Sequence, residues 1–135
     1  MIKKAVKIFL INAKNELLLY LRDNNPLISS PGHWDLIGGG VEENESDMEA
    51  LEREIKEEIN IKVENIKYIN DIWHEEENNG EMVHMLLFKG NIEAVLYQIN
   101  LTEGQKLGFF KLEDLNKLKI PKVYLNFIEK NKIID

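Results

Sequence analysis

The stretch GGGVEENESDMEALEREIKEEIN, residues 38–60, decides the fold that this 135-residue chain adopts. Ser46 together with Glu49 fits the S-x-x-E capping box, which predicts that a helix begins near residue 46. Apolar side chains then recur at spacings of 3, 4 and 4 and mark one buried stripe: Met48, Leu51, Ile55 and Ile59. The stretch therefore predicts an amphipathic helix over about 46–59 that packs against another layer.

Strand-like segments flank this helix on both sides. Apolar runs bounded by turn residues predict strands at 4–11, 17–22, 65–76, 82–90 and 106–112. A short helical turn is predicted at 112–118, and a terminal helix over 121–133 begins with Pro121. Segment 82–90 is apolar on both faces, so we expect it inside the sheet. The predicted fold class is α/β (α+β), a mixed β-sheet with helices on both faces.

Length and composition limit the kinds of protein that this chain can be. A chain of 135 residues suits one domain, 1–135, with a real core. No apolar run approaches the roughly 18 residues of a membrane span, so we expect no membrane partner. The first twelve residues are typical of a strand rather than of a signal peptide. The chain has no cysteine and hence no disulfide or thiolate metal site, which fits a cytoplasmic location.

The net charge of −7 is concentrated in one segment. Residues 38–61 contain nine acidic and two basic side chains, whereas the rest of the chain is balanced. The basic patch typical of proteins that bind nucleic-acid polymers is missing, so we expect no such partner. A dense acidic segment is either a solvated surface or a site for cations.

Two glutamates of the predicted helix have an ordinary explanation as surface ion pairs. Glu49 lies four residues before Arg53, and Glu52 lies four residues before Lys56. This order of acid and base stabilises an isolated helix by a few tenths of a kcal/mol, roughly 0.2–0.5 per pair. A solvated helix face therefore accounts for these two acids.

Three other glutamates of the helix, Glu54, Glu57 and Glu58, are not explained in this way. Glu54 and Glu58 repel each other at i,i+4, and Glu57 faces Ile61. At about 100° per residue, the three carboxylates share one arc beside the apolar stripe. Gly38–Gly40 upstream permit close backbone approaches and expose carbonyls, although a plain flexible turn is the alternative. Carbonyl and carboxylate oxygens together are ligands that suit Mg²⁺.

The spacing of these residues resembles the Nudix box, G-x5-E-x7-R-E-U-x-E-E-x-G-U, where U is a bulky aliphatic residue. Eight of nine specified positions match in this chain: Gly39, Glu45, Arg53, Glu54, Ile55, Glu57, Glu58 and Ile61. The exception is Asn60, where the family has Gly. Asn tolerates the left-handed conformation that often ends a helix, so we expect Asn60 to keep that backbone role. Asn44 and Ile37 also depart from common family residues, Gly and Pro, without removing a chemical group.

The resemblance implies a Nudix hydrolase, similar to the MutT-like members, with the Nudix-type α/β/α sandwich. Such enzymes hydrolyse a nucleoside diphosphate linked to a group X and use Mg²⁺ or Mn²⁺. For this short chain we expect a (d)NTP, or an oxidised one such as 8-oxo-dGTP, to give NMP and pyrophosphate. The alternative substrates are ADP-ribose and nucleotide sugars, and a third reading is a non-catalytic nucleotide-binding domain. The partner is thus a small nucleotide, and a homodimer is left open.

The resemblance also implies roles for individual residues. Glu57 and Glu58 would be the main metal ligands, with the Gly38 carbonyl as a further one. Glu54 would be a ligand or the general base, and Arg53 would orient it. Glu45 would tie the loop to the helix through Arg53.

Outside the helix, the resemblance implies that substrate phosphates meet Arg22, Gly39 and Gly40. For Arg22 the alternative is an ordinary exposed arginine at the end of a strand. Some family members take the base from beyond the box, which makes Glu93 and Glu103 alternative candidates.

Overall fold

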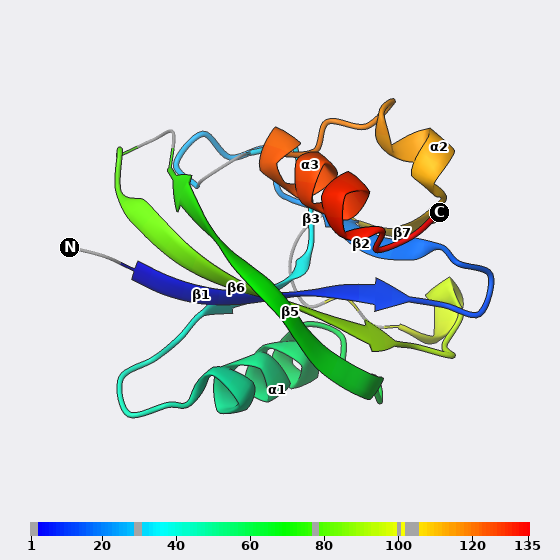
Figure 1. Cartoon of the computed structure of the whole chain (residues 1–135), viewed down its shortest axis with the longest axis horizontal. Coiled ribbons are helices and arrows are strands. Elements are labelled where there is room, and N and C mark those ends of the chain that lie inside the picture. Colours follow the sequence, from blue (N-terminus) through cyan, green and yellow to red (C-terminus); the bar gives the residue numbers. More distant parts are fainter. Residues whose placement is uncertain (1–2, 29–30, 77–78, 100, 102–105) are drawn as a thin grey trace.

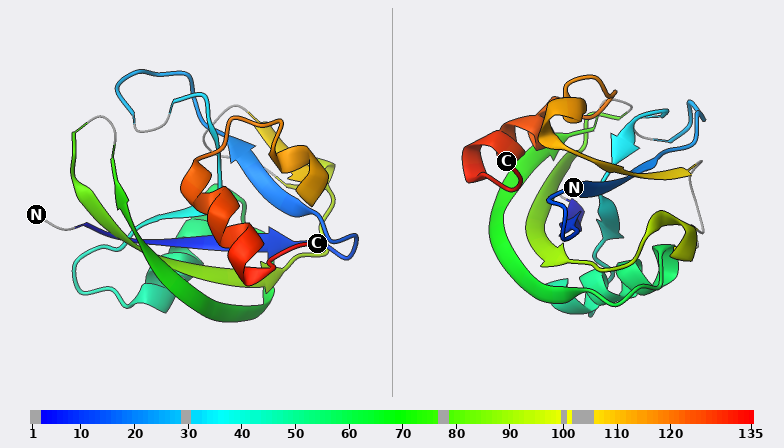
Figure 2. Two further views of the ribbon diagram at one scale, coloured as in Figure 1. Left: turned by 45° about the horizontal axis from the view of Figure 1, so that its top comes forward. Right: turned by 90° about the vertical axis from the view of Figure 1, so that its right-hand side faces the viewer.

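The computed structural model describes residues 3–28, 31–76, 79–99, 101 and 106–135. These residues form a seven-stranded mixed sheet with helices on opposite sides of it (Figures 1 and 2). The strands are β1 (Lys3–Ile11), β2 (Leu17–Leu21), β3 (Trp34–Asp35), β4 (Ile37–Gly40), β5 (Glu64–Glu75), β6 (Met82–Asn91) and β7 (Lys106–Phe110). The helices are α1 (Asp47–Glu58), the 3₁₀ helix η1 (Leu96–Gln98), α2 (Leu112–Leu115) and α3 (Lys122–Asn131).

The predicted mixed sheet and its helical cover are confirmed. The strand order is β3-β2-β1-β6-β5, with β1 and β6 parallel and the other pairs antiparallel. Strand β6 lies between two others, as its apolar faces predict. The segment 34–40, which includes the three glycines, forms two short strands, β3 and β4, which the sequence pattern did not predict. In the part of the chain that the structure describes, no helix is long and apolar enough to span a membrane.

Two apolar cores lie on the two faces of the sheet. Alternate residues of β1 point into them, with Phe9 facing the core under α3 and Ile8 facing the core under α1. The stripe of α1 buries Leu51, Ile55 and Ile59 in this second core, as predicted. The prediction for Met48 is wrong, because its side chain lies at the first turn of α1 and is exposed.

Both ends of α1 are set by local hydrogen bonds. The Glu49 N–H donates to Ser46 Oγ at 3.1 Å, and the Ser46 N–H donates to Glu49 Oε1 at 3.0 Å, which confirms the capping box. At the other end, Asn60 has φ of 49° and its N–H donates to the Ile55 carbonyl at 2.9 Å. Asn60 therefore has the left-handed conformation expected where the family has Gly.

The sheet forks beside β1, and this fork positions the site. Strand β1 pairs with β4 along Ala5–Ile8 but pairs with β2 only at Ile11. Strands β2 and β4 therefore diverge from the same side of β1 and leave a space between them.

Candidate functional site

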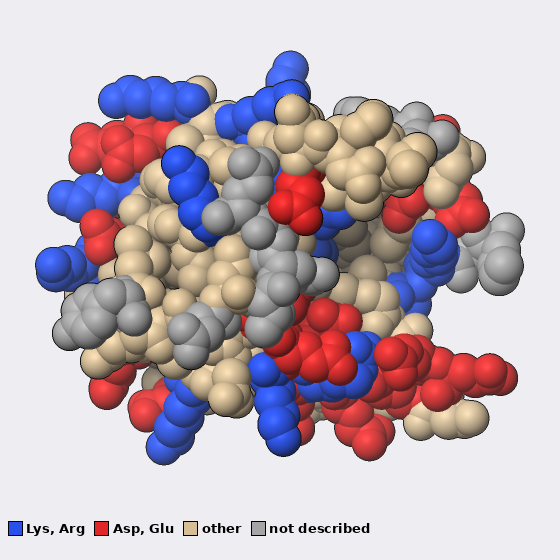
Figure 3. Space-filling model, turned by 180° about the vertical axis from the view of Figure 1, so that it is seen from behind, with Lys and Arg blue, Asp and Glu red and all other residues tan. Residues whose placement is uncertain are grey.

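A cleft of about 740 Å³ occupies the space at this fork. The residues that line it come from both sides of the sheet: from the strands β1, β2, β4, β5 and β6, from Asp35 of β3, and from the helices α1 and α3. Seen from behind, the molecule shows a hollow with acidic side chains gathered below it, over α1 and the loop before it (Figure 3). The residues that line the cleft include Gly38, Gly39, Gly40, Glu54, Glu58 and Arg22. The fork thus brings six of the predicted site residues to one cleft.

Glu54 reaches the cleft wall because residue 39 has no side chain. A Cβ atom at Gly39 would lie 2.5 Å from Glu54 Oε1 and 2.7 Å from its Cδ. The carboxylate therefore fills the space that any other residue at position 39 would need. Only 14% of the Glu54 side chain is exposed, so the strand of glycines holds it at the edge of the cleft.

Glu58 is buried at the base of the same wall. Its Oε2 accepts a hydrogen bond from the Gly38 N–H at 3.0 Å. Gly38 has φ of 143°, and a Cβ there would lie 2.1 Å from the Val6 carbonyl oxygen. Position 38 therefore requires glycine, and its backbone orients the Glu58 carboxylate.

Arg53 connects the loop before α1 to the glutamates of the helix. Its Nε donates to Glu45 Oε2 at 2.7 Å and its Nη2 donates to Glu45 Oε1 at 3.0 Å. Nη2 also donates to the Gly40 carbonyl at 3.0 Å, and Nη1 donates to Glu54 Oε1 at 2.9 Å. The hydrogen bonds from Arg53 lower the pKa of Glu45, and the backbone N–H of Glu42 lowers it further. A single guanidinium thus fixes the loop, the glycine strand and Glu54 together.

Glu57 is not among the residues that line the cleft. Its side chain is 60% exposed, and Oε2 lies 3.3 Å from Arg53 Nη1. This is a favourable i,i+4 pair, so the prediction from sequence, which left Glu57 without an ion-pair explanation, was wrong. The three carboxylates lie on neighbouring sides of the helix but in different environments, because Glu54 and Glu58 line the cleft and Glu57 does not.

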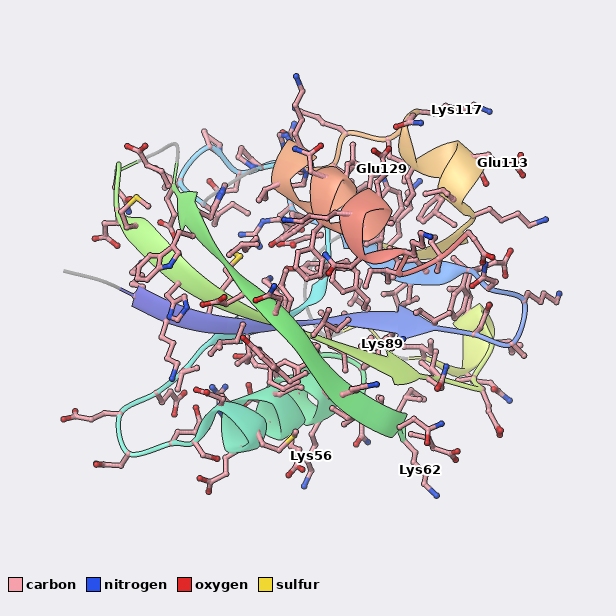
Figure 4. All side chains as sticks on the ribbon, in the orientation of Figure 1. Lys56, Lys62, Lys89, Glu113, Lys117 and Glu129 are labelled. Atoms are coloured by element: carbon pink, nitrogen blue, oxygen red, sulfur yellow. The ribbon has the colours of Figure 1, made fainter. Side chains whose placement is uncertain are left out.

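The two predicted surface pairs of α1 do not form within the described residues. Arg53 turns toward Glu45 and the glycines, while Glu49 serves the capping box instead. Lys56 extends outward from α1 (Figure 4). The spacing along the helix allows these pairs, but Arg53 instead binds Glu45 and the Gly40 carbonyl, which the fold brings close to it.

In their present positions, the carboxylates of the helix supply only part of the ligand set that a divalent cation needs. Among the described residues, no group of three or more His, Cys, Asp or Glu side chains is arranged to hold a metal ion. Glu54 and Glu58 supply hard oxygen donors on the cleft wall, which is the donor chemistry that Mg²⁺ requires. A third carboxylate becomes available if Glu57 rotates from Arg53 toward the cleft.

A second polar cluster, which the sequence pattern did not predict, lies on the floor of the cleft. Lys7 and Asp35 are buried, and Lys7 Nζ lies 3.3 Å from Asp35 Oδ2. Arg22 Nη1 donates to the same oxygen at 3.2 Å and to the Tyr20 hydroxyl oxygen at 3.1 Å. Burial is the largest single effect and lowers the pKa of Lys7, but Asp35 together with Tyr124, Tyr20 and Glu58 raises that pKa above its ordinary value. The signal in the sequence was a lysine at an inward position of an apolar strand.

Of the two alternative base candidates beyond the box, Glu93 is among the described residues. Glu93 is exposed after β6 and does not line the cleft. Glu103 lies outside the described residues. Among the described carboxylates, Glu54 is therefore the one best placed between the cleft and Arg53.

Comparison with known proteins gives a consistent result. A family model described as the NUDIX domain matches residues 1–130. A search of curated proteins finds no match. Among solved structures, the chain is similar to the MutT protein from Methanosarcina mazei Go1, with a TM-score of 0.81, 25% identity, and coverage of 97% of this chain and 93% of that one.

Two further structures extend the comparison. A MutT NUDIX hydrolase from Burkholderia pseudomallei has a TM-score of 0.73 and 25% identity, covering 85% of this chain and 87% of that one. The NUDIX domain of Shewanella oneidensis NrtR, solved with ADP ribose, has a TM-score of 0.76 at 17% identity, with coverage of 96% and 85%. This last likeness concerns the fold alone.

Proposed function

The chain belongs to the NUDIX domain family, and we propose that its cleft hydrolyses a nucleoside diphosphate linked to a group X, with Mg²⁺ or Mn²⁺ as cofactor. The substrate that we expect is a (d)NTP or an oxidised (d)NTP, and the products are NMP and pyrophosphate. The observation that carries the proposal is the contact of Arg53 with Glu54 against the glycine strand, on the wall of a cleft of about 740 Å³, which is in the range of small-molecule sites. We assign the whole chain, 1–135, to one domain and to the cytoplasm on the sequence grounds given above.

The residues that would hold the metal are Glu58 and, after rotation of its side chain, Glu57, with the Gly38 carbonyl as a further oxygen. Glu54 would be a further ligand or the general base. When bound, Mg²⁺ polarises a phosphoryl oxygen and lowers the pKa of a coordinated water. A cleft wall with two carboxylates otherwise repels a polyphosphate, so substrate binding and cation binding are expected to depend on each other.

Glu54 is proposed as the general base. Arg53 Nη1 holds Oε1 of Glu54, which leaves Oε2 to accept the proton of the attacking water. The water oxygen forms the new bond to phosphorus while the bond from phosphorus to the leaving pyrophosphate oxygen breaks. Arg53 and Gly39 act as positioning residues for the Glu54 carboxylate, because Arg53 donates to it and Gly39 leaves the space that it fills.

The alternative substrate, ADP-ribose or a nucleotide sugar, uses the same residues with a different X. The NrtR domain in complex with ADP ribose is an instance of this fold with such a ligand, and it supports testing that substrate. A non-catalytic nucleotide-binding role is the third possibility, and retention of all four box glutamates argues against it.

The deciding experiment is a screen with Mg²⁺ of (d)NTPs, oxidised (d)NTPs, ADP-ribose and nucleotide sugars, in which released phosphates are measured. NMP with pyrophosphate supports the first substrate class, and AMP with ribose phosphate supports the alternative. Nucleotide binding without any turnover contradicts the hydrolase proposal. A shift of the melting temperature with millimolar Mg²⁺ or Mn²⁺ is an independent readout of the metal site, since a ligand that binds only the folded state stabilises it.

A further inference from the structure

The chain crosses the fork in the sheet at Leu36, which lies between β3 and β4. Asp35 pairs with Tyr20 at the edge of β2, and Ile37 pairs with Ile8 at the edge of β1. Leu36 therefore belongs to neither strand, although it is fully buried. A buried N–H or carbonyl without a hydrogen-bond partner is costly, so the backbone groups of Leu36 need partners other than a neighbouring strand.

The ion pair between Lys7 and Asp35 supplies both of these partners. The Leu36 N–H donates to Asp35 Oδ1 at 2.7 Å, and Lys7 Nζ donates to the Leu36 carbonyl at 3.3 Å. Lys7 Nζ also donates to Asp35 Oδ2 at 3.3 Å, so the two side chains are joined to each other as well as to Leu36. Together they hold the crossing segment, residues 35–38, against β1.

Lys7 is a costly residue for its position. Its neighbours on the same face of β1, Ala5 and Phe9, lie in the apolar core under α3, and only 8% of the Lys7 side chain is exposed. Burying an ammonium group is unfavourable unless it is paired, and apolar residues often replace a buried ion pair without loss of stability. An apolar side chain, however, cannot donate to the Leu36 carbonyl. This donor is therefore what Lys7 supplies to the fold.

The segment that Lys7 holds continues into the glycines of the cleft wall. Lys7 lies opposite Gly38 in the pairing of β1 with β4, and a Cβ atom at Gly38 would lie 3.0 Å from Lys7 Cδ. The Lys7 side chain therefore passes close to Gly38. The Gly38 N–H donates to Glu58 Oε2 at 3.0 Å. The residue beside which Lys7 lies is thus the one that orients the Glu58 carboxylate.

We propose that Lys7 is a positioning residue for the metal-binding wall of the cleft. By holding the crossing segment on β1, Lys7 fixes the Gly38 N–H and, through it, the Glu58 carboxylate. Asp35 acts together with Lys7, because it bonds the other backbone group of Leu36. This inference rests on the proposed function, in which Glu58 is a metal ligand. Groups that orient a metal ligand typically change metal affinity by about 10- to 100-fold when they are removed.

The first measurement needs no metal and follows hydrogen exchange of the Gly38 amide by NMR. Lys7→Met keeps the length of the side chain but removes the donor, and it is expected to accelerate this exchange by roughly 10-fold. Phe127→Leu is the control for lost stability, because Phe127 is stacked on Phe9 in the core under α3 and does not line the cleft. It should leave the Gly38 rate near the wild-type value. Equal acceleration in the two variants would overturn the proposal.

The second measurement is the affinity for Mn²⁺, followed by electron paramagnetic resonance. Lys7→Met is expected to bind Mn²⁺ about 10- to 100-fold more weakly. The sign of this change is informative, because removing a positive charge beside a cation site would by itself strengthen binding. Phe127→Leu should bind Mn²⁺ as the wild type does. Unchanged or tighter binding in Lys7→Met would contradict a positioning role.

Two further outcomes need separate readings. If Lys7→Met does not fold, as judged by its melting curve, the double variant Lys7→Met with Asp35→Leu decides, since it removes the ion pair as a unit and leaves the net charge unchanged. It must then show both faster exchange at Gly38 and weaker Mn²⁺ binding. If the wild type neither binds Mn²⁺ nor hydrolyses a nucleotide, the proposed function fails, whereas Gly38 exchange still tests the hold of Lys7 on the glycine strand. A wild-type exchange rate in the variant overturns the inference in either case.

Discussion

At the scale of single residues, the site depends on a missing side chain as much as on charged ones. Gly39 leaves the space that the Glu54 carboxylate fills, and Gly38 leaves the space beside the Val6 carbonyl. Gly40, in contrast, has nothing within 4 Å of where its Cβ would lie. Two of the three consecutive glycines are therefore required by close contacts, and the third is not.

Gly39→Ala is expected to displace Glu54 and so to reduce Mn²⁺ affinity and turnover together. The added Cβ cannot coexist with a carboxylate oxygen 2.5 Å away. Mn²⁺ binding followed by electron paramagnetic resonance measures the first effect, and phosphate release measures the second. Gly40→Ala is the matched control for folding, and its melting temperature should stay near that of the wild type. If Gly39→Ala binds Mn²⁺ normally, the proposed role of Glu54 at the metal is wrong.

Glu54→Gln is expected to lower kcat by about 10²–10⁴-fold, because the amide cannot take a proton from water. The amide oxygen can still accept from Arg53, so the fold and KM should change little. Steady-state kinetics on the substrate found in the screen provides the measurement. Glu52→Gln, on the exposed part of the same helix, is the control and should retain wild-type rates. Comparable activity in the two variants would show that Glu54 is not the general base.

At the scale of elements, the way in which helix α1 ends explains why Asn60 can stand where the family pattern has Gly. Asn60 has positive φ, which costs an ordinary residue roughly 1–2 kcal/mol and costs Gly nothing. Asn44 in the loop before the helix also has positive φ, of 66°. Both departures therefore keep the backbone conformation that Gly provides elsewhere in the family.

Asn60→Gly is expected to preserve the free energy of unfolding, and Asn60→Ala to lower it by about 1 kcal/mol. Denaturation by urea measures both. Asn116→Ala is the comparison, because Asn116 ends α2 in the right-handed helical region and should tolerate Ala. Equal loss in Asn60→Gly and Asn60→Ala would mean that the amide side chain, and not the backbone conformation, matters.

The loop before α1 is tied down by the pair between Glu45 and Arg53, which should make its stability depend on pH. The folded pKa of Glu45 is lowered below its ordinary value of 4.5 by Arg53. A lowered pKa contributes stability above pH 4.5, and this contribution is lost as pH falls through the folded pKa. Glu45→Gln should therefore be less stable than wild type at pH 7, with a difference that shrinks below pH 4.5.

Urea titrations of the two proteins between pH 7 and pH 3 provide this measurement. Glu43→Gln in the same loop is the control, because Glu43 is exposed and has no ion pair among the described residues. A difference that stays constant across the acid range would show that Glu45 acts by packing alone.

At the scale of the whole molecule, the pair between Lys7 and Asp35 joins β1 to β3 across the fork in the sheet. Asp35→Leu leaves the buried Lys7 without its ion pair, which typically costs about 3–5 kcal/mol. Lys7→Met is expected to lose less, because Asp35 keeps its ion pair with Arg22. The double variant should lose less than the sum, since apolar side chains of similar volume pack well there. A double-mutant cycle on the free energy of unfolding measures the coupling, and strict additivity would contradict it.

The sequence by itself determined the local features of this protein. The capping box, the end of α1 at Asn60 and most of the buried stripe follow from contacts between residues three or four positions apart. The central place of β6 follows from its apolar faces. The spacing of the box residues was also sufficient to identify the family, because the pattern is contained in one continuous segment.

Only the tertiary structure decided which of these residues share the cleft. Gly39 meets Glu54 and Lys7 meets Asp35 because β1, β3, β4 and α1 come together at the fork, and sequence spacing does not encode that approach. The same packing turned Arg53 from its predicted helical partner Glu49 toward Glu45, and left Glu57 facing solvent. Helical periodicity fixes the angle of a side chain around its axis, whereas its partners depend on which distant segment lies at that angle.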